Sequence, residues 1–325
     1  MKTIRWGLIG CGAVTEVKSG PALQKADHSE LVAVMRRDGA KAKDYAERHD
    51  VPRWYDNADA LINDPEVDAV YIATPPDSHM HYTLAVAKAG KPVYVEKPMA
   101  RNYAECQIMI DACKDAGVPL FVAYYRRELP RFLKVKELVD SGIIGNIRFV
   151  TVMFRPPPPT TIDSEHLPWR YLPEMAGGGI FLDMGSHMLD ILDHILGPIG
   201  SVSGSASNQW GQYPAEDIVT GSFVFENGIH GVGTWCFTSF DHCDQTEIVG
   251  ERGRITYSCF GNDPILLTTN QGSQEFNIEN PAHIQQPLIQ TVVNDLIGLE
   301  KCVSTGDTAA RTSWVMEQMI TDFYS

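Results

Sequence analysis

The chain has 325 residues, 44% of them hydrophobic, and this length and composition indicate two domains with large cores. Its 41 acidic and 27 basic residues give a formal net charge of −14. Because an acidic surface repels phosphate backbones, we exclude nucleic-acid binding as a main role.

The cysteines and the apolar segments indicate where the protein works. Seven cysteines are scattered along the chain with no C-x-x-C pair, a pattern that argues against a zinc ribbon or a dithiol redox site and fits a reducing compartment. The first residues, MKTIRWGLIG, lack the long apolar segment and cleavage site of a signal peptide. No run approaches the ~20 apolar residues that span a bilayer. We therefore expect a soluble, cytoplasmic protein that does not bind membranes.

A glycine turn follows the first predicted strand, residues 3–9. The segment Gly10-Cys11-Gly12-Ala13-Val14-Thr15 reads G-x-G-x-x-T, close to the dinucleotide-binding pattern G-x-G-x-x-G. Gly10 would permit the tight turn, Gly12 would let a pyrophosphate approach, and the following amides would bind the anion. Thr15 departs from the pattern, and Gly20-Pro21 interrupts the region where a helix should follow. We therefore expect an extended loop and a helix that begins near Pro21.

Strands and helices alternate over the first 123 residues. Strands are predicted at 31–35, 54–55, 68–73, 92–95 and 120–123, and helices at 41–48, 57–62, 78–89 and 102–117. Ser78 is predicted to cap one helix, and Asn102 with Glu105 resembles a capping box for another. This alternation is typical of a doubly wound parallel sheet, so residues 1–123 are predicted to form a dinucleotide-binding Rossmann domain.

The end of the second strand bears on the choice of cofactor. Arg36 and Arg37 stand where a carboxylate would accept the ribose 2′-hydroxyl of NAD, and Asp38 is the acidic residue nearby. Two guanidiniums suit a 2′-phosphate by charge and by their forked donors. We predict that NADP is preferred over NAD. A solvated basic turn is the alternative.

The fourth strand is followed by Thr74-Pro75-Pro76. Two prolines make a rigid wall that would suit a cofactor ribose and nicotinamide, although a simple strand-to-helix turn has the same composition. His79 and His81 stand two apart, so on a helix they point to different faces and a joint metal site is not expected. One of the two is predicted to face the cofactor.

The fifth strand ends in Glu96-Lys97-Pro98. Open α/β sheets bind ligands at the carboxyl ends of their strands. Pro98 removes a backbone donor and disfavours helical geometry at Lys97, so Lys97 is predicted to lie in an extended turn at the edge of a cleft. A solvated lysine after a proline-ended strand is the alternative.

Beyond residue 123 the alternation stops, and residues 124–325 are predicted to form an α+β domain for substrate binding and oligomerisation. Helices are expected at 126–142, 287–302 and 308–323, and strands at 147–154, 202–206, 218–225, 231–237, 245–250, 254–258 and 265–269. Period-two alternation and turn residues between strands indicate a large, mostly antiparallel sheet. Because an open sheet face usually needs a partner, we expect a homodimer or homotetramer through this sheet.

A triple glycine, Gly177-Gly178-Gly179, precedes Asp183 and His187. If the segment is helical, residues four apart share one face, which suits a carboxylate beside an imidazole. Three interpretations remain open: a catalytic pair, a helix cap with an ordinary half-buried histidine, or a metal site that includes His194. No third ligand has convincing spacing, so we predict no metal.

The order of these motifs is distinctive. G-C-G follows the first strand, E-K-P follows the fifth, and W-R then G-G-G-x-x-x-D-x-G-x-H lie in the second domain. Over nearly its whole length the chain resembles the glucose–fructose oxidoreductase/inositol dehydrogenase (Gfo/Idh/MocA) family. The resemblance implies reversible hydride transfer between NAD(P) and a sugar, polyol or related hydroxyl compound.

The resemblance also implies roles for individual residues. Lys97, Asp183 and His187 match the family's catalytic lysine, aspartate and histidine. His187 would take the hydroxyl proton, Asp183 would orient it, and Lys97 would stabilise the developing alkoxide. The positions that match the cofactor site are Gly10, Cys11, Gly12, Ala13, Val14, Arg36, Arg37, Thr74, Pro75, His79, Glu96, Lys97, Trp169 and Arg170.

The substrate side is less defined by the resemblance. Tyr125 stands where many members have an asparagine before an arginine, here Arg126. His283 is a further substrate candidate, with a solvated loop histidine as the alternative. A non-catalytic NAD(P)-binding sensor and an NAD-dependent glycosidase of related fold are the competing functions, and the substrate and the direction of reaction stay open.

Overall fold

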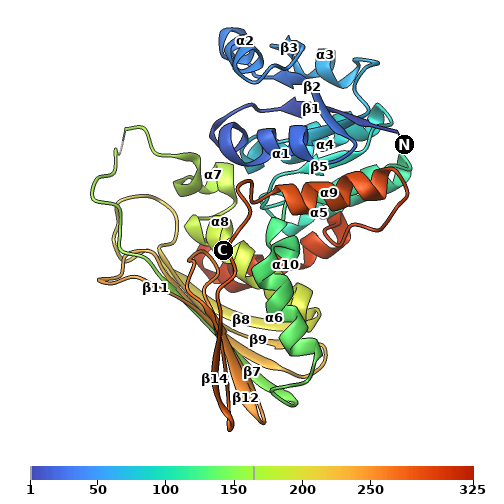
Figure 1. Cartoon of the computed structure of the whole chain (residues 1–325). Helices are drawn as coiled ribbons and strands as arrows, with labels where there is room; N and C mark the ends of the chain where they lie inside the picture. The colour runs from blue at the N-terminus through green and yellow to red at the C-terminus, as the bar shows by residue number, and fades with distance from the viewer. Residues whose placement is uncertain (1, 164) are drawn as a thin grey trace. The chain divides into compact units, whose positions relative to one another are not determined.

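The computed structural model describes residues 2–163 and 165–325, and the chain forms two compact units (Figure 1). The first unit comprises the residues up to Leu129 together with Pro281–Ala310, and the second comprises Pro130–Asn280 with Arg311–Ser325. The segment Pro281–Ala310 thus packs in the first unit although it follows the second in sequence. This division describes packing, and the predicted boundary between residues 123 and 124 remains a proposal about functional domains.

The first unit contains a six-stranded sheet in the order β3-β2-β1-β4-β5-β6, in which all pairs are parallel. The predicted doubly wound fold is confirmed. β4 and β5 are buried throughout, because a parallel sheet is covered on both faces. The strands are β1 (Ile4–Ile9), β2 (Ser29–Met35), β3 (Arg53–Tyr55), β4 (Ala69–Ile72), β5 (Val93–Val95) and β6 (Leu120–Val122). The helices are α1 (Gly20–Lys25), α2 (Gly39–Arg48), α3 (Ala58–Ile62), α4 (His79–Lys88), α5 (Tyr103–Asp115) and α9 (Gln286–Leu296).

The segment after β1 differs from the extended loop that we predicted. Residues Thr15–Ser19 form a π-helical turn, and α1 then begins at Gly20 with Pro21 in its first turn, as expected. The Tyr45 hydroxyl donates to Thr15 O at 2.9 Å and holds this turn. A Cβ on Gly20 would lie 2.3 Å from both that hydroxyl and Thr15 O, so only glycine fits where the turn meets α1.

Two predicted helix caps have different outcomes. Asn102 caps α5 as predicted, since its side chain accepts from Glu105 N at 2.9 Å. The Glu105 carboxylate binds Arg101 N at 3.1 Å, one residue before the expected partner. Ser78 stands at the N-cap position of α4, as predicted, but its side chain makes no capping hydrogen bond. Its hydroxyl donates instead to Thr74 Oγ1 at 2.8 Å and ties the turn after β4 together.

The second unit contains an eight-stranded sheet in the order β14-β13-β12-β11-β7-β10-β9-β8. Only β7 and β10 pair in parallel, which confirms the mostly antiparallel prediction for the described residues. Figure 1 shows these strands as one twisted layer. The strands are β7 (Ile147–Arg155), β8 (Ile199–Ser207), β9 (Ile218–Phe225), β10 (His230–Cys236), β11 (Cys243–Gly250), β12 (Gly253–Tyr257), β13 (Ile265–Thr269) and β14 (Gly272–Phe276). The helices of this part of the chain are α6 (Pro130–Asp140), α7 (Pro173–Ala176), α8 (Ile180–Leu196) and α10 (Gly306–Tyr324).

One face of this sheet is covered by helices. Phe181 of α8 packs on Trp235 of β10 with ring centroids 5.0 Å apart. A Cβ on Gly204 of β8 would lie 2.5 Å from the backbone of Met319, so α10 approaches the sheet closely. The helix that carries Asp183 and His187 therefore rests on a rigid sheet.

Three further predictions are corrected. The helix expected at 126–142 is broken, because Pro130 favours an extended residue before it and Leu129 has ψ 134°. The helix expected at 287–302 ends at Leu296, and Gly298 follows with φ 78°. β14 was missed because its residues are mostly polar and exposed.

Among the residues that the structure describes, no helix combines the length and apolar character that a membrane crossing requires. All seven cysteines are free thiols. The cytoplasmic location stays a prediction.

Candidate functional site

The glycine turn after β1 has two glycines with different constraints. Gly10 has φ +95°, and a Cβ on it would lie 2.8 Å from Thr74 Cγ2. A Cβ on Gly12 would meet only Gly10 O, at 3.8 Å. The fold itself therefore requires glycine at position 10, whereas the space at position 12 is open to a ligand. Cys11 is buried between them, and burial raises the pKa of its thiol to about 11, so it is a neutral packing residue.

Thr15, the departure from the glycine pattern, has a local function. Its hydroxyl donates to Gly12 O at 2.8 Å, and its Oγ1 lies 3.0 Å from Gly12 N. The side chain thus closes the loop on itself. Ala13 and Val14 lie in the first helical turn after this loop, where amide groups lack intrahelical partners.

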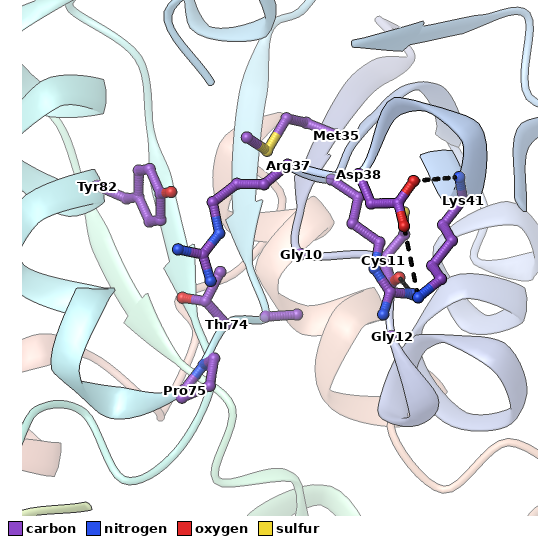
Figure 2. Close-up of a pocket in the computed structure, with 12 residues that line it drawn as sticks. Gly10, Cys11, Gly12, Met35, Arg37, Asp38, Lys41, Thr74, Pro75 and Tyr82 are labelled. Atoms are coloured by element: carbon purple, nitrogen blue, oxygen red, sulfur yellow. Dashed lines mark hydrogen bonds and ion pairs between the residues drawn. The ribbon is translucent and has the colours of Figure 1, made fainter. Parts of the chain in front are cut away.

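A pocket of about 360 Å³ lies at the carboxyl ends of β1, β2 and β4 (Figure 2). This is the point at which the strand order of the sheet reverses, where doubly wound proteins bind nucleotides. Twelve residues line the pocket: Gly10, Cys11, Gly12, Met35, Arg36, Arg37, Asp38, Lys41, Ala73, Thr74, Pro75 and Tyr82. The structure thus brings together seven of the predicted cofactor residues.

The charged residues of the pocket are arranged around the end of β2. Arg36 Nη1 donates to Cys11 O at 3.1 Å and links β2 to the glycine turn. Asp38 caps α2 by accepting from Lys41 N at 3.2 Å, a hydrogen bond that lowers the pKa of this carboxyl. In Figure 2 the Arg37 guanidinium lies on the Thr74 side of the pocket, and Asp38 lies with Lys41 on the other side. The carboxylate is thus engaged in capping, while Arg37 extends into the pocket.

The turn after β5 is held by a buried carboxylate. Glu96 N donates to Ile72 O at 2.8 Å, which continues the sheet for one residue. The Glu96 carboxylate accepts from Tyr71 Oη at 2.5 Å, from Gln285 Nε2 at 2.8 Å and from Lys97 N at 3.1 Å. Lys97 itself is half-buried, and the Lys97–Pro98 peptide bond is cis.

His79 is fully buried beside this turn. One ring nitrogen lies 2.7 Å from Thr74 O, and the other lies 3.1 Å from Pro98 O and 3.2 Å from Met99 O. Burial lowers the pKa of His79, so the ring is neutral near pH 7. His79 thus connects the turn after β4 to the turn after β5. It does not line the pocket, and direct contact with a cofactor stays a prediction.

In the second unit, Asp183 and His187 lie on consecutive turns of α8. The N-cap of α8 is Gly179, so the interpretation of Asp183 as the cap is wrong. Arg170 Nε lies 3.4 Å from Asp183 Oδ2. The guanidinium carbon of the same arginine lies over the Trp169 ring, 5.5 Å from its centroid. The structure therefore joins two residues that we predicted for separate roles, Arg170 and Asp183, in an ion pair.

His187 is almost fully buried, and its ring packs against Phe260 at a centroid distance of 5.9 Å. Phe260 follows β12 in a loop that Asp244 holds, with its carboxylate accepting from the amides of Cys259, Phe260 and Gly261 at 2.6 to 3.0 Å. No pattern in the sequence indicated that Asp244 holds this loop, because Asp244 lies on β11 whereas the loop follows β12.

Glu216 explains the triple glycine. Both of its carboxylate oxygens lie 2.8 Å from Gly179 N, and Tyr324 Oη donates to it at 2.5 Å. A Cβ on Gly179 would lie 2.5 Å from Glu216 O. The glycines therefore admit a buried carboxylate to the start of α8, where burial raises its pKa. Sequence reasoning did not find this residue.

The remaining candidates have structural partners. Arg126 stacks over the Tyr125 ring at 5.0 Å, and both side chains are buried in the first unit. His283 Nε2 lies 2.9 Å from Lys25 Nζ, so this histidine contacts the end of α1. Substrate roles for all three stay predictions. Within the described residues, no group of three or more His, Cys, Asp or Glu side chains has the arrangement of a metal site.

The parallel sheet, the glycine turn and the pocket at its switch point define a dinucleotide-binding protein. Residues 4–124 match the model of the GFO/IDH/MocA oxidoreductase family, described as an NAD-binding Rossmann fold, and residues 132–256 match the GFO/IDH/MocA C-terminal domain. The chain belongs to this family and is an NAD(P)-dependent oxidoreductase.

Individual relatives are consistent with that assignment. Oxidoreductase P35 of Formosa agariphila is 41% identical over 315 residues, which cover 97% of each chain. Myo-inositol 2-dehydrogenase of Thermotoga maritima is 30% identical over 83% of this chain and 80% of its own length. The solved structure of levoglucosan dehydrogenase with NADH and levoglucosan has a TM-score of 0.87 at 20% identity, covers 98% of this chain and 97% of its own, and shows the shared fold.

Proposed function

We propose that the enzyme transfers a hydride between nicotinamide C4 and a hydroxyl or carbonyl carbon of a sugar or polyol. The observation that carries the proposal is the Asp183–His187 pair on one face of α8, with Asp183 ion-paired to Arg170. Relatives named as a myo-inositol 2-dehydrogenase and a levoglucosan dehydrogenase support the substrate class.

The roles follow from the chemistry of alcohol oxidation. As hydride leaves for the nicotinamide, the hydroxyl proton needs a base, and His187 is a suitable acceptor. Asp183 would orient the imidazole and stabilise its protonated form. Lys97 would hydrogen-bond the substrate oxygen and stabilise the developing negative charge. In reduction the proton moves in the opposite direction.

The test is turnover by variants of the proposed catalytic residues. His187→Ala and Lys97→Met should each lower turnover at least ~10²-fold and leave cofactor affinity little changed. His81→Ala, an exposed histidine on α4, is the control. NADPH oxidation is followed by absorbance with ketoses and keto-sugars, and NADP reduction with polyols such as myo-inositol. Near-normal turnover in either variant would contradict the role assignment. Tight NADPH binding without any turnover in the wild-type protein would favour a sensor.

We also propose that NADP is preferred over NAD. Arg36 and Arg37 supply two guanidiniums at the pocket, Lys41 adds an ammonium, and Asp38 is engaged with Lys41. A 2′-phosphate would therefore meet positive charge. Arg37→Ala should weaken NADPH binding about tenfold and leave NADH binding little changed. Lys43→Ala, which removes a positive charge from the following helix α2, is the charge-matched control. Equal losses for the two cofactors would refute the preference.

Finally, we propose a homodimer or homotetramer formed through the eight-stranded sheet. The central strands β7 and β10 present apolar side chains on the sheet's exposed face: Phe149 is 40% exposed, Met153 37% and Val232 52%. Thr151 lies between Phe149 and Met153 and opposite Val232 in the register. Exposed apolar side chains gathered on one sheet face are typical of an interface. Light scattering that shows a monomer at micromolar concentration would refute this assembly.

A further inference from the structure

Three buried polar side chains of the first unit meet behind the turn that carries Lys97. Glu96 is 6% exposed, Gln285 1% and Tyr71 0%. Glu96 Oε1 accepts from both Tyr71 Oη and Gln285 Nε2, and Oε2 accepts from Lys97 N. Two of the three donors come from the turn and from the neighbouring strand β4. The third, Gln285, comes from a segment nearly two hundred residues later in the chain.

Gln285 is itself firmly placed. It is the N-cap residue of α9, and its carbonyl accepts from Ile289 N at 3.0 Å. α9 contacts α1, and Gln290 accepts from Asp27 N at 2.7 Å through its side chain. In Figure 1 the red ribbon of α9 lies beside α1. The amide therefore reaches Glu96 from a fixed helix end and not from a mobile loop.

The Glu96 side chain is held by donors on both of its oxygens. Tyr71 Oη and Gln285 Nε2 bind Oε1 at 2.5 and 2.8 Å, and Lys97 N binds Oε2 at 3.1 Å. A buried carboxylate that loses one of its donors is destabilised where it stands, because no water replaces the lost hydrogen bond. The position of Glu96, and with it the acceptor of Lys97 N, therefore depends on Tyr71 and Gln285.

We propose that Gln285 is a positioning residue for Lys97. With Tyr71, its amide holds the Glu96 side chain behind the turn, and Glu96 in turn fixes the backbone of Lys97. This inference rests on the catalytic role proposed above for Lys97.

Replacement of the amide by an apolar group has a specific consequence. In Gln285→Leu, the buried Glu96 carboxylate loses one of its three donors, so its side chain is held less firmly. Lys97 N then loses a fixed acceptor, and the turn that carries Lys97 is less well ordered. Binding of NADPH at the glycine loop does not depend on this contact.

The experiment measures kcat for NADPH-dependent reduction and, separately, the affinity for NADPH. Gln285→Leu should lower kcat about tenfold with NADPH affinity unchanged, because the change acts on Lys97 and not on the cofactor site. Tyr71→Phe, which keeps the ring stack with Tyr94 at 4.9 Å, should lower kcat in the same way. Gln290→Leu is the control, because it disturbs the docking of α9 without touching Glu96.

The outcomes separate this inference from the proposed function. If Lys97→Met is inactive while Gln285→Leu and Tyr71→Phe keep the wild-type kcat, Gln285 has no positioning role. A kcat for Gln285→Leu that matches that of Gln290→Leu, or a loss of NADPH affinity equal to the loss of kcat, would overturn the inference in the same way. Near-normal activity of Lys97→Met would overturn the catalytic role of the lysine itself, and with it this inference.

Discussion

At the scale of single residues, the two glycines of the loop after β1 have different structural roles. Gly10 lies against Thr74 with a positive φ, and Gly12 has open space around its Cα. A side chain at position 10 therefore meets the protein, whereas one at position 12 would meet the ligand. The pattern G-x-G does not distinguish these cases, because both glycines look alike in the sequence.

We predict that Gly12→Ala folds normally and loses most of its affinity for NADPH, because its methyl group would occupy the path of the pyrophosphate. Gly10→Ala should instead destabilise the protein, by about 1–3 kcal/mol, through overpacking against Thr74 and the strained φ. Thermal unfolding and fluorescence titration with NADPH measure the two effects. A Gly12→Ala protein that binds NADPH normally would contradict a pyrophosphate at this loop.

Glu16 provides a prediction about pH. Hydrogen bonds from Arg48 and His49 lower the pKa of Glu16 to about 2, from 4.5. A lowered carboxyl pKa stabilises the folded state above pH 4.5, and this stabilisation is lost as the pH falls toward 2. The wild-type protein should therefore exceed Glu16→Gln in unfolding temperature at pH 7, with a difference that narrows below about pH 4.5. A difference that stays constant from pH 7 to pH 3 would be inconsistent with this ion pair.

At the scale of elements, the start of α8 depends on a strand far away in sequence. The carboxylate of Glu216, just before β9, binds Gly179 N, and Tyr324 near the end of α10 binds the same carboxylate. The C-terminal helix also contacts α8 through Arg311, which donates to both oxygens of Asp193. The helix that carries Asp183 and His187 is thus held at both ends.

We predict that Gly179→Ala destabilises the protein by about 1–3 kcal/mol, because its Cβ would lie 2.5 Å from Glu216 O. Gly200→Ala on β8 is the matched control, since its Cβ would approach the flexible Glu226 side chain at 3.3 Å and the Glu226 backbone only at an ordinary 3.8 Å. Chemical denaturation measures both variants. If Gly179→Ala and Gly200→Ala have the same free energy of unfolding, the prediction is wrong and the backbone at Gly179 relaxes to admit the Cβ.

At the scale of the whole molecule, one face of the eight-stranded sheet carries exposed apolar side chains that no described residue of the chain buries. Phe149 and Met153 on β7 alternate with buried Val150 and Val152, and Val232 lies on the adjacent strand. The alternation assigns one face to the helices and the other to solvent or to a second copy.

We predict that Val232→Glu lowers the molecular mass measured by light scattering, because a charge at the centre of this face opposes sheet-on-sheet packing. Val17→Glu, at an exposed valine of the first unit, should leave the mass unchanged. An unchanged oligomer in Val232→Glu would place the interface elsewhere.

The sequence by itself determined the elements and the local motifs of this protein. The alternation of strands and helices, the glycine turn, the arginines after β2 and the Asn102 cap all depend on residues within a few positions of one another. Such patterns have periods and spacings that local backbone geometry imposes. The error at Leu129 was local too, because the adjacent Pro130 breaks an otherwise helical pattern and is visible in the sequence.

Only the tertiary structure decided which side chains support the site. Gln285 reaches Glu96, Glu216 reaches Gly179 and Asp244 holds the loop of Phe260, across 189, 37 and 16 residues of chain. No spacing rule encodes such contacts, because they arise when strands from different parts of the chain become neighbours. The buried polar groups then need partners wherever the fold places them, and the physical demand to satisfy them, not sequence proximity, selects these residues.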